Sequence, residues 1–166
     1  HEKGIDVLSM EISSHGLDQH RADSVTFEAA AFTNLSQDHL DYHPSMDDYF
    51  DAKARLFTQL LKPGSRAVIN ADDVWGQKLM DICHDKGLSV QSFGRNGHHF
   101  KITSITPTAT GQDVIVVHNN QEHHLSLSLM GEFQAYNALC AFILSGLDIQ
   151  DLPRVEQLQT VDGRME

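Results

Sequence analysis

The chain has 166 residues, of which 40% are hydrophobic and 21% charged, a composition typical of a soluble globular protein with one domain's worth of core. Its formal net charge of −11 argues against a nucleic-acid-binding surface, because such a surface needs a basic stripe. No window approaches the roughly 18 continuous apolar residues of a membrane-spanning helix, and there is no signal-peptide pattern. We therefore expect neither nucleic acid nor membrane as a partner.

The first half of the chain alternates short apolar runs with helical patterns, which predicts a mostly parallel α/β sheet flanked by helices. The expected strands of this half are Ile5–Met10, Ala29–Phe32, Arg66–Asn70 and Leu88–Phe93. The polar, mixed residues Ser14–Thr26 between the first two strands indicate a loop or a short helix.

Two long helices separate the later strands of this half. The first begins at Ser45, which forms a capping-box pattern with Asp48, and runs to about Leu61. The second covers Val74–Lys86 and is ended by Gly87.

The pattern changes after Gly94, where β-rich runs separated by turn residues predict a small antiparallel meander attached to the main sheet. These runs are Phe100–Thr106, Asp113–His118 and His123–Leu129. A helix over Gly131–Ser145 and a short one near Asp151–Gln159 follow. The chain thus divides into a parallel α/β part (1–94), an antiparallel part (95–130) and a helical return to the site (131–166).

Polar side chains follow the predicted strands, and in open α/β sheets ligands bind outside the carboxyl ends of the strands. Glu11 follows the first strand, where a carboxylate suits Mg²⁺. A solvated loop acid or a charge at a helix N-terminus is the alternative. The loop of Asp38, His39, Asp41 and His43 could supply one or two metal ligands, but its spacing fits no structural zinc site. Those side chains could equally cap nearby backbone.

Lys53 lies in the apolar stripe of the helix that starts at Ser45. The stripe consists of Met46, Tyr49, Phe50, Phe57, Leu60 and Leu61. A cation there must snorkel to solvent, pair with an anion, or lose its proton. A neutral amine near a metal can react with CO₂ to form a carbamate, whose oxygens could bind Mg²⁺.

Hydroxyl, amide and guanidinium donors follow Glu11 closely, at Ser13, Ser14, Gln19 and Arg21. Arginine suits bidentate contact with carboxylate or phosphate, which weakly indicates an anionic substrate. Arg164 near the end of the chain is similarly ambiguous.

The pairs His98-His99 and His123-His124 alternate with polar residues on predicted surface strands, so we interpret them as solvated rather than metal-binding. Cys83 and Cys140 lie far apart in helical patterns, which indicates buried, reduced thiols.

Several longer strings resemble the Mur ligase family in the correct order. They are Met10–Leu17 with Gln19 and Arg21, Phe32–Ser36 with Asp38–His43, Ala52-Lys53, Ile69–Asp73 and Gly163–Glu166. The resemblance implies most of an ATP-binding central domain. The family's phosphate loop, Gly-x-x-x-x-Gly-Lys-Ser/Thr, is absent from these residues, and the chain lacks an initiator Met. We therefore expect a piece of a longer polypeptide, inactive and weak in ATP binding by itself.

The resemblance also implies roles for individual residues. Mg²⁺ would be held by Glu11, His39 and carbamylated Lys53. Asn34 would lie near the nucleotide phosphates, Asn137 at adenine and Arg164 at the γ-phosphate. The UDP-muramoyl dipeptide would be contacted by Ser13, Gln19 and Arg21. Gln134 is one methylene longer than the Asn usual in the family at that position.

The implied activity is ATP-dependent amide-bond formation in peptidoglycan synthesis, by a cytoplasmic bacterial enzyme expected to be a monomer. ATP would convert the D-glutamate carboxylate of UDP-N-acetylmuramoyl-L-alanyl-D-glutamate into an acyl phosphate. The amino group of the third residue, meso-diaminopimelate or L-lysine, would then attack it to form the peptide bond. A related folylpolyglutamate or cyanophycin synthetase is disfavoured by Ser13–Gly16 with Gln19 and Arg21. A non-catalytic binding domain is disfavoured by metal-ligand candidates on three separate elements.

Overall fold

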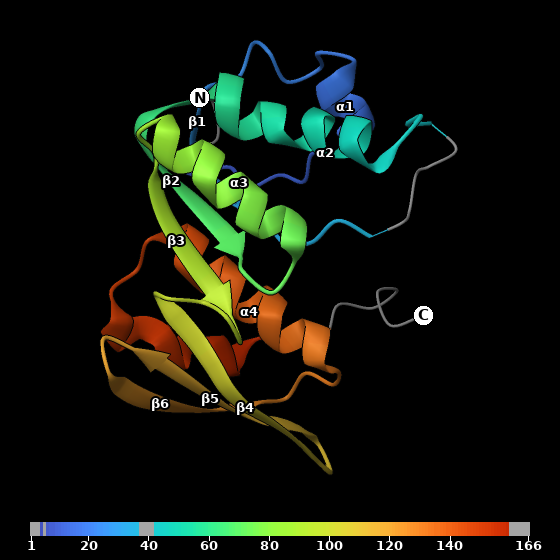
Figure 1. Ribbon diagram of the computed structural model, residues 1–166. Helices are drawn as coiled ribbons and strands as arrows, with labels where there is room; N and C mark the ends of the chain where they lie inside the picture. Colours follow the sequence, from blue (N-terminus) through green and yellow to red (C-terminus); the bar gives the residue numbers. More distant parts are fainter. Residues whose placement is uncertain (1–3, 5, 37–41, 160–166) are drawn as a thin grey trace.

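A computed structural model of the chain describes residues 4, 6–36 and 42–159. Within them, six strands form one sheet in the order β1-β2-β3-β4-β5-β6 (Figure 1). The strands are β1 (Phe27–Phe32), β2 (Leu61–Asn70), β3 (Ser89–Gly94), β4 (Phe100–Thr108), β5 (Gly111–His118) and β6 (Gln121–Leu127). Strands β1 to β4 pair in parallel and β4 to β6 antiparallel. The predicted α/β sheet with an attached meander is confirmed.

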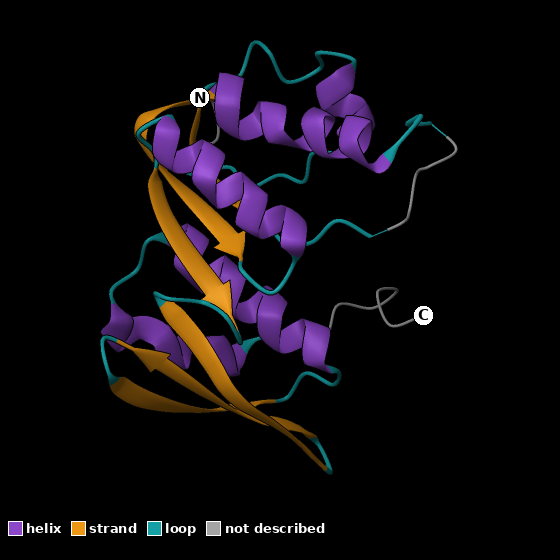
Figure 2. Ribbon diagram, viewed as in Figure 1, coloured by secondary structure: helices purple, strands orange, loops and turns teal. Residues whose placement is uncertain are grey.

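Helices lie on both sides of this sheet (Figure 2). They are α1 (Ser14–Asp18), α2 (Met46–Arg55), the π-helical η1 (Leu56–Leu60), α3 (Val74–Asp85), α4 (Glu132–Ser145) and the 3₁₀-helical η2 (Ile149–Gln157). None of the helices in the described part of the chain has the length and apolar character that crossing a membrane would require.

Strand β2 is buried on both faces and divides the core into two layers. Ala67 and Ile69 pack with α2, η1 and α3, whereas Val68 between them packs with α4 and η2 on the opposite face. Successive side chains of a strand point to opposite faces, so a strand covered on both sides must be apolar at every position. This requirement explains the continuous apolar run that predicted the strand.

The capping prediction for α2 is confirmed. The Ser45 hydroxyl accepts a hydrogen bond from the backbone N–H of Asp48 at 3.1 Å and donates to the Asp48 carboxylate at 2.6 Å. The predicted helical segment to about Leu61 is confirmed in extent, but it is not α-helical throughout, because α2 ends at Arg55 and a π-helical turn carries the chain to Leu60.

The predicted first strand, Ile5–Met10, is not formed. Ile5 lies outside the described residues, and residues 6–13 are irregular. Val7 and Leu8 are 84% and 77% exposed. A strand needs a neighbour that accepts and donates its backbone hydrogen bonds, and β1 is the last strand at this edge of the described sheet. An apolar run predicts a buried strand, but it cannot supply the pairing partner.

The meander buries one side of its strands against α4 and η2. The connection from β5 to β6 turns at Asn119 and Asn120, both with positive φ, as a type I′ two-residue turn requires. The last helix, expected at about Asp151–Gln159, starts two residues earlier and is 3₁₀ with Pro153 inside it.

The two thiols are buried and free, as predicted, and burial raises the pKa of both Cys83 and Cys140 to about 12. The prediction of solvated histidine pairs is wrong for one member of each pair. His99 and His123 are half-buried, and His99 Nδ1 accepts a hydrogen bond from the backbone N–H of Ser92 at 3.1 Å. His123 and His124 lie on β6, where alternation turns one ring of the pair toward the protein, whereas His98 and His99 lie in the connection before β4 rather than on the predicted strand.

A testable consequence concerns Gly76, where α3 meets the end of β2. Alanine is favoured over glycine inside helices by about 1 kcal/mol. At Gly76, however, a Cβ would lie 2.0 Å from the backbone oxygen of Asn70. We expect Gly76→Ala to lower the free energy of unfolding by about 2–3 kcal/mol, measured by urea denaturation. Gly16→Ala is the matched control, because a Cβ at this helical glycine would lie 3.5 Å from its nearest neighbour, Ser13 Oγ, at ordinary contact distance. Equal stability of the two variants would contradict the close contact.

Candidate active-site rim

The carboxyl ends of β1, β2 and β3 are joined to one another by side chains from the end of β2. Asn70 Nδ2 donates to the backbone oxygen of Thr33 at 2.9 Å, just after β1. Asp73 accepts from the backbone N–H of Leu35 at 2.8 Å, and its second oxygen caps α3 at the N–H of Trp75, also at 2.8 Å. The residues that follow β1 are therefore held in place by the polar string that follows β2.

Asp72 makes the equivalent connection on the other side of β2. Its carboxylate accepts from the backbone N–H groups of Arg95 and Asn96, at 2.8 and 2.7 Å, in the loop after β3. It also accepts from the Tyr136 hydroxyl on α4 at 2.7 Å. Burial, together with the bond to Asp72, raises the pKa of Tyr136 to about 12, so the phenol remains a neutral donor.

Lys53 and Asn34, both predicted site residues, are in direct contact. Lys53 Nζ donates to the backbone oxygen of Asn34 at 3.2 Å. Lys53 as a residue is half-buried, and its ammonium lies 5.1 Å from the ring centre of Tyr49 and 5.9 Å from that of Phe32. These aromatic faces favour a cation. The lysine of the apolar stripe thus reaches the carboxyl end of β1.

The three predicted substrate contacts lie on or beside α1. Ser13 is the N-cap of this helix, and its hydroxyl accepts from the N–H of Gly16 at 3.1 Å. Gln19 ends the helix and donates from Nε2 to the Tyr42 hydroxyl at 3.4 Å. Arg21 follows with an exposed side chain. Glu11 is exposed in the irregular segment before α1, rather than at the end of a strand.

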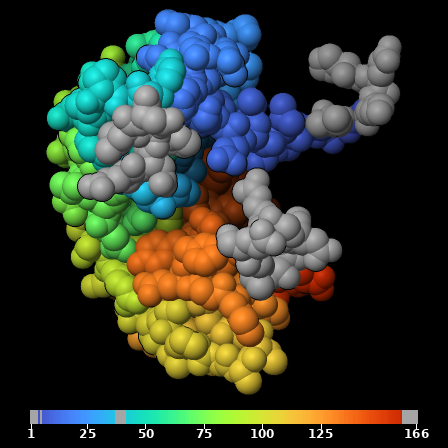
Figure 3. Space-filling view, turned by 90° about the vertical axis from the view of Figure 1, so that its right-hand side faces the viewer, coloured from blue at the N-terminus to red at the C-terminus, as the bar shows by residue number. Residues whose placement is uncertain are grey.

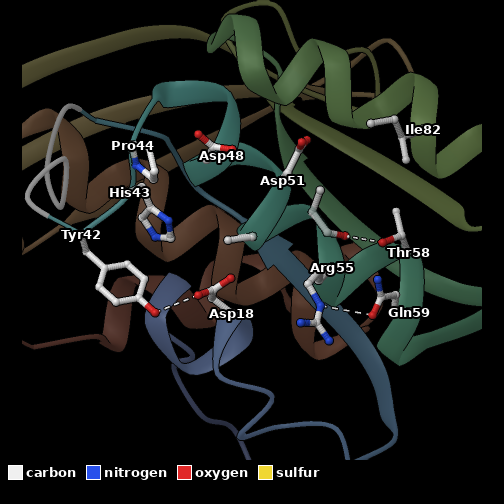
Figure 4. Close-up of a pocket in the computed structure, with 12 residues that line it drawn as sticks. Asp18, Tyr42, His43, Pro44, Asp48, Asp51, Arg55, Thr58, Gln59 and Ile82 are labelled. Atoms are coloured by element: carbon white, nitrogen blue, oxygen red, sulfur yellow. Dashed lines mark hydrogen bonds between the residues drawn. The ribbon is translucent and has the colours of Figure 1, made fainter.

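A buried pair beside α1 was not identified from sequence. His43 Nε2 and Ser14 Oγ are 2.9 Å apart, and the two residues are only 4% and 1% exposed. The neighbouring Tyr42 donates its hydroxyl to Asp18 at 2.8 Å (Figure 4). Asp18, Tyr42 and His43 line an open groove of about 670 Å³, whose other walls come mainly from α2 and η1. The only sequence signal was the alternation of imidazoles and carboxylates that ends at His43.

The remaining predicted residues are placed less completely. Asn137 is exposed on α4 and Gln134 is half-buried one turn earlier. His39 and Arg164 lie outside the described residues. The described residues contain no group of three or more His, Cys, Asp or Glu side chains able to hold a metal ion. The predicted magnesium set, with one member outside this part of the chain, stays a prediction.

We call the residues that follow β1, β2 and β3, with the side chains that join them, the rim. It opens on the side where these three strands end. Figure 3 views that side, and a hollow separates the blue N-terminal segment from the orange start of α4. A Mur ligase middle-domain family matches residues 1–145. The chain belongs to the Mur ligase family. This assignment confirms the resemblance drawn from the sequence strings.

Curated relatives of this Mur ligase middle domain are named UDP-N-acetylmuramoyl-L-alanyl-D-glutamate--2,6-diaminopimelate ligase. The chain is 43% identical over 169 residues to the one from Caulobacter vibrioides and 40% identical over 171 residues to the one from Agrobacterium fabrum. Both matches cover 99% of this chain but only 35% and 34% of the relative. The chain therefore spans about a third of the length of these relatives.

Solved structures agree with the assignment. A ligase of the same name superposes with a TM-score of 0.80 at 30% identity, covering 93% of this chain and 33% of that one. MurF from Acinetobacter baumannii gives a TM-score of 0.75 at 19% identity, covering 87% and 32%, and shares the fold.

The bonds at Asp72 lead to a stability prediction. Asp72→Asn replaces one acceptor oxygen by an NH₂ group that must face a donor. We therefore expect the free energy of unfolding, measured by urea denaturation, to fall by about 2–3 kcal/mol. Tyr136→Phe removes one of the three bonds and should cost about 1 kcal/mol. Asp81→Asn, an exposed position on α3, is the control for the charge change. If Asp72→Asn is as stable as Tyr136→Phe, the bonds from Asp72 to the backbone N–H groups of Arg95 and Asn96 contribute little to stability.

Proposed function

We propose that this Mur ligase middle domain serves, within the intact enzyme, in ATP-dependent addition of 2,6-diaminopimelate to UDP-N-acetylmuramoyl-L-alanyl-D-glutamate. The observation that carries the proposal is Lys53, held against Asn34 at the carboxyl end of β1. Beside it, α1 packs against α2 and presents the predicted substrate contacts. The names of the relatives supply the substrate and favour diaminopimelate over lysine.

The proposed role of each residue is the one that the resemblance to the Mur ligase family implies, and the chemistry of each side chain is compatible with it. Ser13, Gln19 and Arg21 would bind the UDP-muramoyl dipeptide through a hydroxyl, an amide and a guanidinium group. Asn34 would lie near the nucleotide phosphates. On α4, which covers the opposite face of the sheet, Asn137 would contact adenine. Arg164, which lies outside the described residues, would reach the γ-phosphate. The dipeptide carboxylate would take the γ-phosphoryl group, and the incoming amine would then displace phosphate to form the amide.

The donor set fits a magnesium ion only if Lys53 is modified. The ammonium that donates to Asn34 cannot be a metal ligand, because it has no free electron pair. A carbamate on the same nitrogen would offer the oxygen ligands that Mg²⁺ prefers, together with Glu11 and His39. Bound there, Mg²⁺ would neutralise phosphate charge during phosphoryl transfer.

Turnover by the intact protein tests this function. We expect ADP release with Mg²⁺, ATP and the UDP-muramoyl dipeptide when diaminopimelate is supplied, and little release with L-lysine. Release with lysine alone would keep the ligase assignment but reverse the amino-acid assignment. Absence of release with either amino acid would refute the proposed reaction.

The carbamate is tested at Lys53. Lys53→Ala should abolish ADP release, because the variant loses one anionic ligand for Mg²⁺, and added bicarbonate or small carboxylates should partly restore activity. Lys78→Ala is the matched control, since Lys78 Nζ also lies over aromatic rings, 4.5 Å from Phe50 and 5.1 Å from Trp75, but on α3. Full activity of Lys53→Ala would exclude a carbamate ligand.

A further inference from the structure

We propose that His43 is a positioning residue that fixes α1 relative to Lys53, so that the dipeptide-binding side chains and the lysine keep one geometry. The inference rests on the proposed function, because it takes α1 as the dipeptide-binding element and Lys53 as part of the reaction site. The sequence analysis considered His43 only as one of four loop side chains that could bind metal or cap backbone, and the relatives' names supply no role for it.

The first contact joins His43 to α1. Its Nε2 and the Ser14 hydroxyl are 2.9 Å apart, and both residues are almost fully buried. A buried polar group that loses its partner costs far more than one that can turn to water. Ser14 is the first residue of α1 and the neighbour of Ser13, so this bond fixes the start of the helix.

The second contact joins His43 to α2. The imidazole stacks on the Tyr49 ring with 5.0 Å between centroids and 12° between planes. Tyr49 lies one turn before Lys53, and the Lys53 ammonium is 5.1 Å from the centre of the same ring. The Tyr49 ring therefore touches both the histidine that holds α1 and the lysine at the end of β1.

Tyr42 reinforces the connection at the far end of α1. Its hydroxyl bonds Asp18 and Gln19, and its ring lies 3.8 Å from the His15 ring and edge-on to His43 at 4.8 Å. Figure 4 shows Tyr42 and His43 side by side above α1, with the Tyr42 hydroxyl directed at Asp18. Two consecutive residues thus contact both ends of the five-residue helix.

The burial of His43 favours a positioning role over a chemical one. Only 4% of the residue is exposed, and its Nε2 faces Ser14. Because the residues that follow it lead directly into the Ser45 cap of α2, displacement of the imidazole would be transmitted to both helices. Loss of the contact should therefore weaken dipeptide binding, because the predicted dipeptide-binding side chains lie on or beside α1.

The test uses the intact protein and compares Ser14→Ala, His43→Phe and the double variant. His43→Phe keeps a ring to stack on Tyr49 but cannot bond Ser14. We expect each single variant to raise KM for the UDP-muramoyl dipeptide about tenfold, with KM for diaminopimelate unchanged. The double variant should be no worse than either single one, because both remove the same bond. His43→Gln, which can place an amide nitrogen near the Nε2 position, should recover part of the loss.

The matched control is His99→Phe, which removes a comparable half-buried His–Ser contact, 3.0 Å from His99 Nδ1 to Ser92 Oγ, where β3 meets β4. It should lower stability without changing either KM. Equal KM shifts in His99→Phe and His43→Phe would assign the effect to general destabilisation and overturn the proposal, as would additive shifts in the double variant.

A second measurement separates this proposal from the proposed function. Amide hydrogen exchange over residues 14–19 should become several-fold faster in Ser14→Ala and His43→Phe but not in His99→Phe, with or without turnover. A wild-type protein that releases no ADP refutes the proposed function, and the exchange result still decides whether His43 holds α1. Unchanged exchange in both variants would overturn the positioning role.

Discussion

The arrangement of the rim depends on the carboxylates and amide at the end of β2. Where parallel strands end, the loops that follow them have backbone donors and acceptors that need partners. Asn70, Asp72 and Asp73 satisfy donors or acceptors after β1 and after β3, and Asp72 also binds a phenol from α4 on the opposite face. One short polar string thereby sets the mutual positions of segments far apart in sequence. The close approach of α3 at Gly76 belongs to the same junction, because that glycine lies directly against the Asn70 carbonyl.

The second organising feature is the apolar cradle of Lys53. Its aromatic neighbours exclude solvent from part of the side chain, while the Asn34 carbonyl gives its nitrogen a partner at the end of β1. A lysine in this position reaches the rim with little freedom of its own. Because Tyr49 forms part of that cradle and also stacks on His43, the geometry of the lysine and that of α1 are physically connected.

Much of this fold could be predicted from the sequence, because parallel strands, helix caps and hairpins have local signatures. The Ser45 cap and the Asn119-Asn120 turn are examples. The errors came from features that local patterns do not contain. The run from Ile5 had the right composition for a strand, but pairing depends on a neighbour. The bond between Ser14 and His43 joins residues 29 positions apart, and nothing in either local sequence indicates it. The site residues were identified through family resemblance, and spacing alone left their roles open.

The two-sided burial of β2 has a consequence for how the chain unfolds. Val68 and Ile69 are adjacent in sequence and completely buried, yet they belong to cores on opposite faces of the sheet. Neither layer can be exposed to solvent without withdrawing support from the strand that the other layer also needs. The helices that cover the two faces should therefore be lost in a single cooperative transition rather than as separate subdomains. Such coupling would keep the segments that follow β1 and β3 in their mutual positions until the whole domain unfolds.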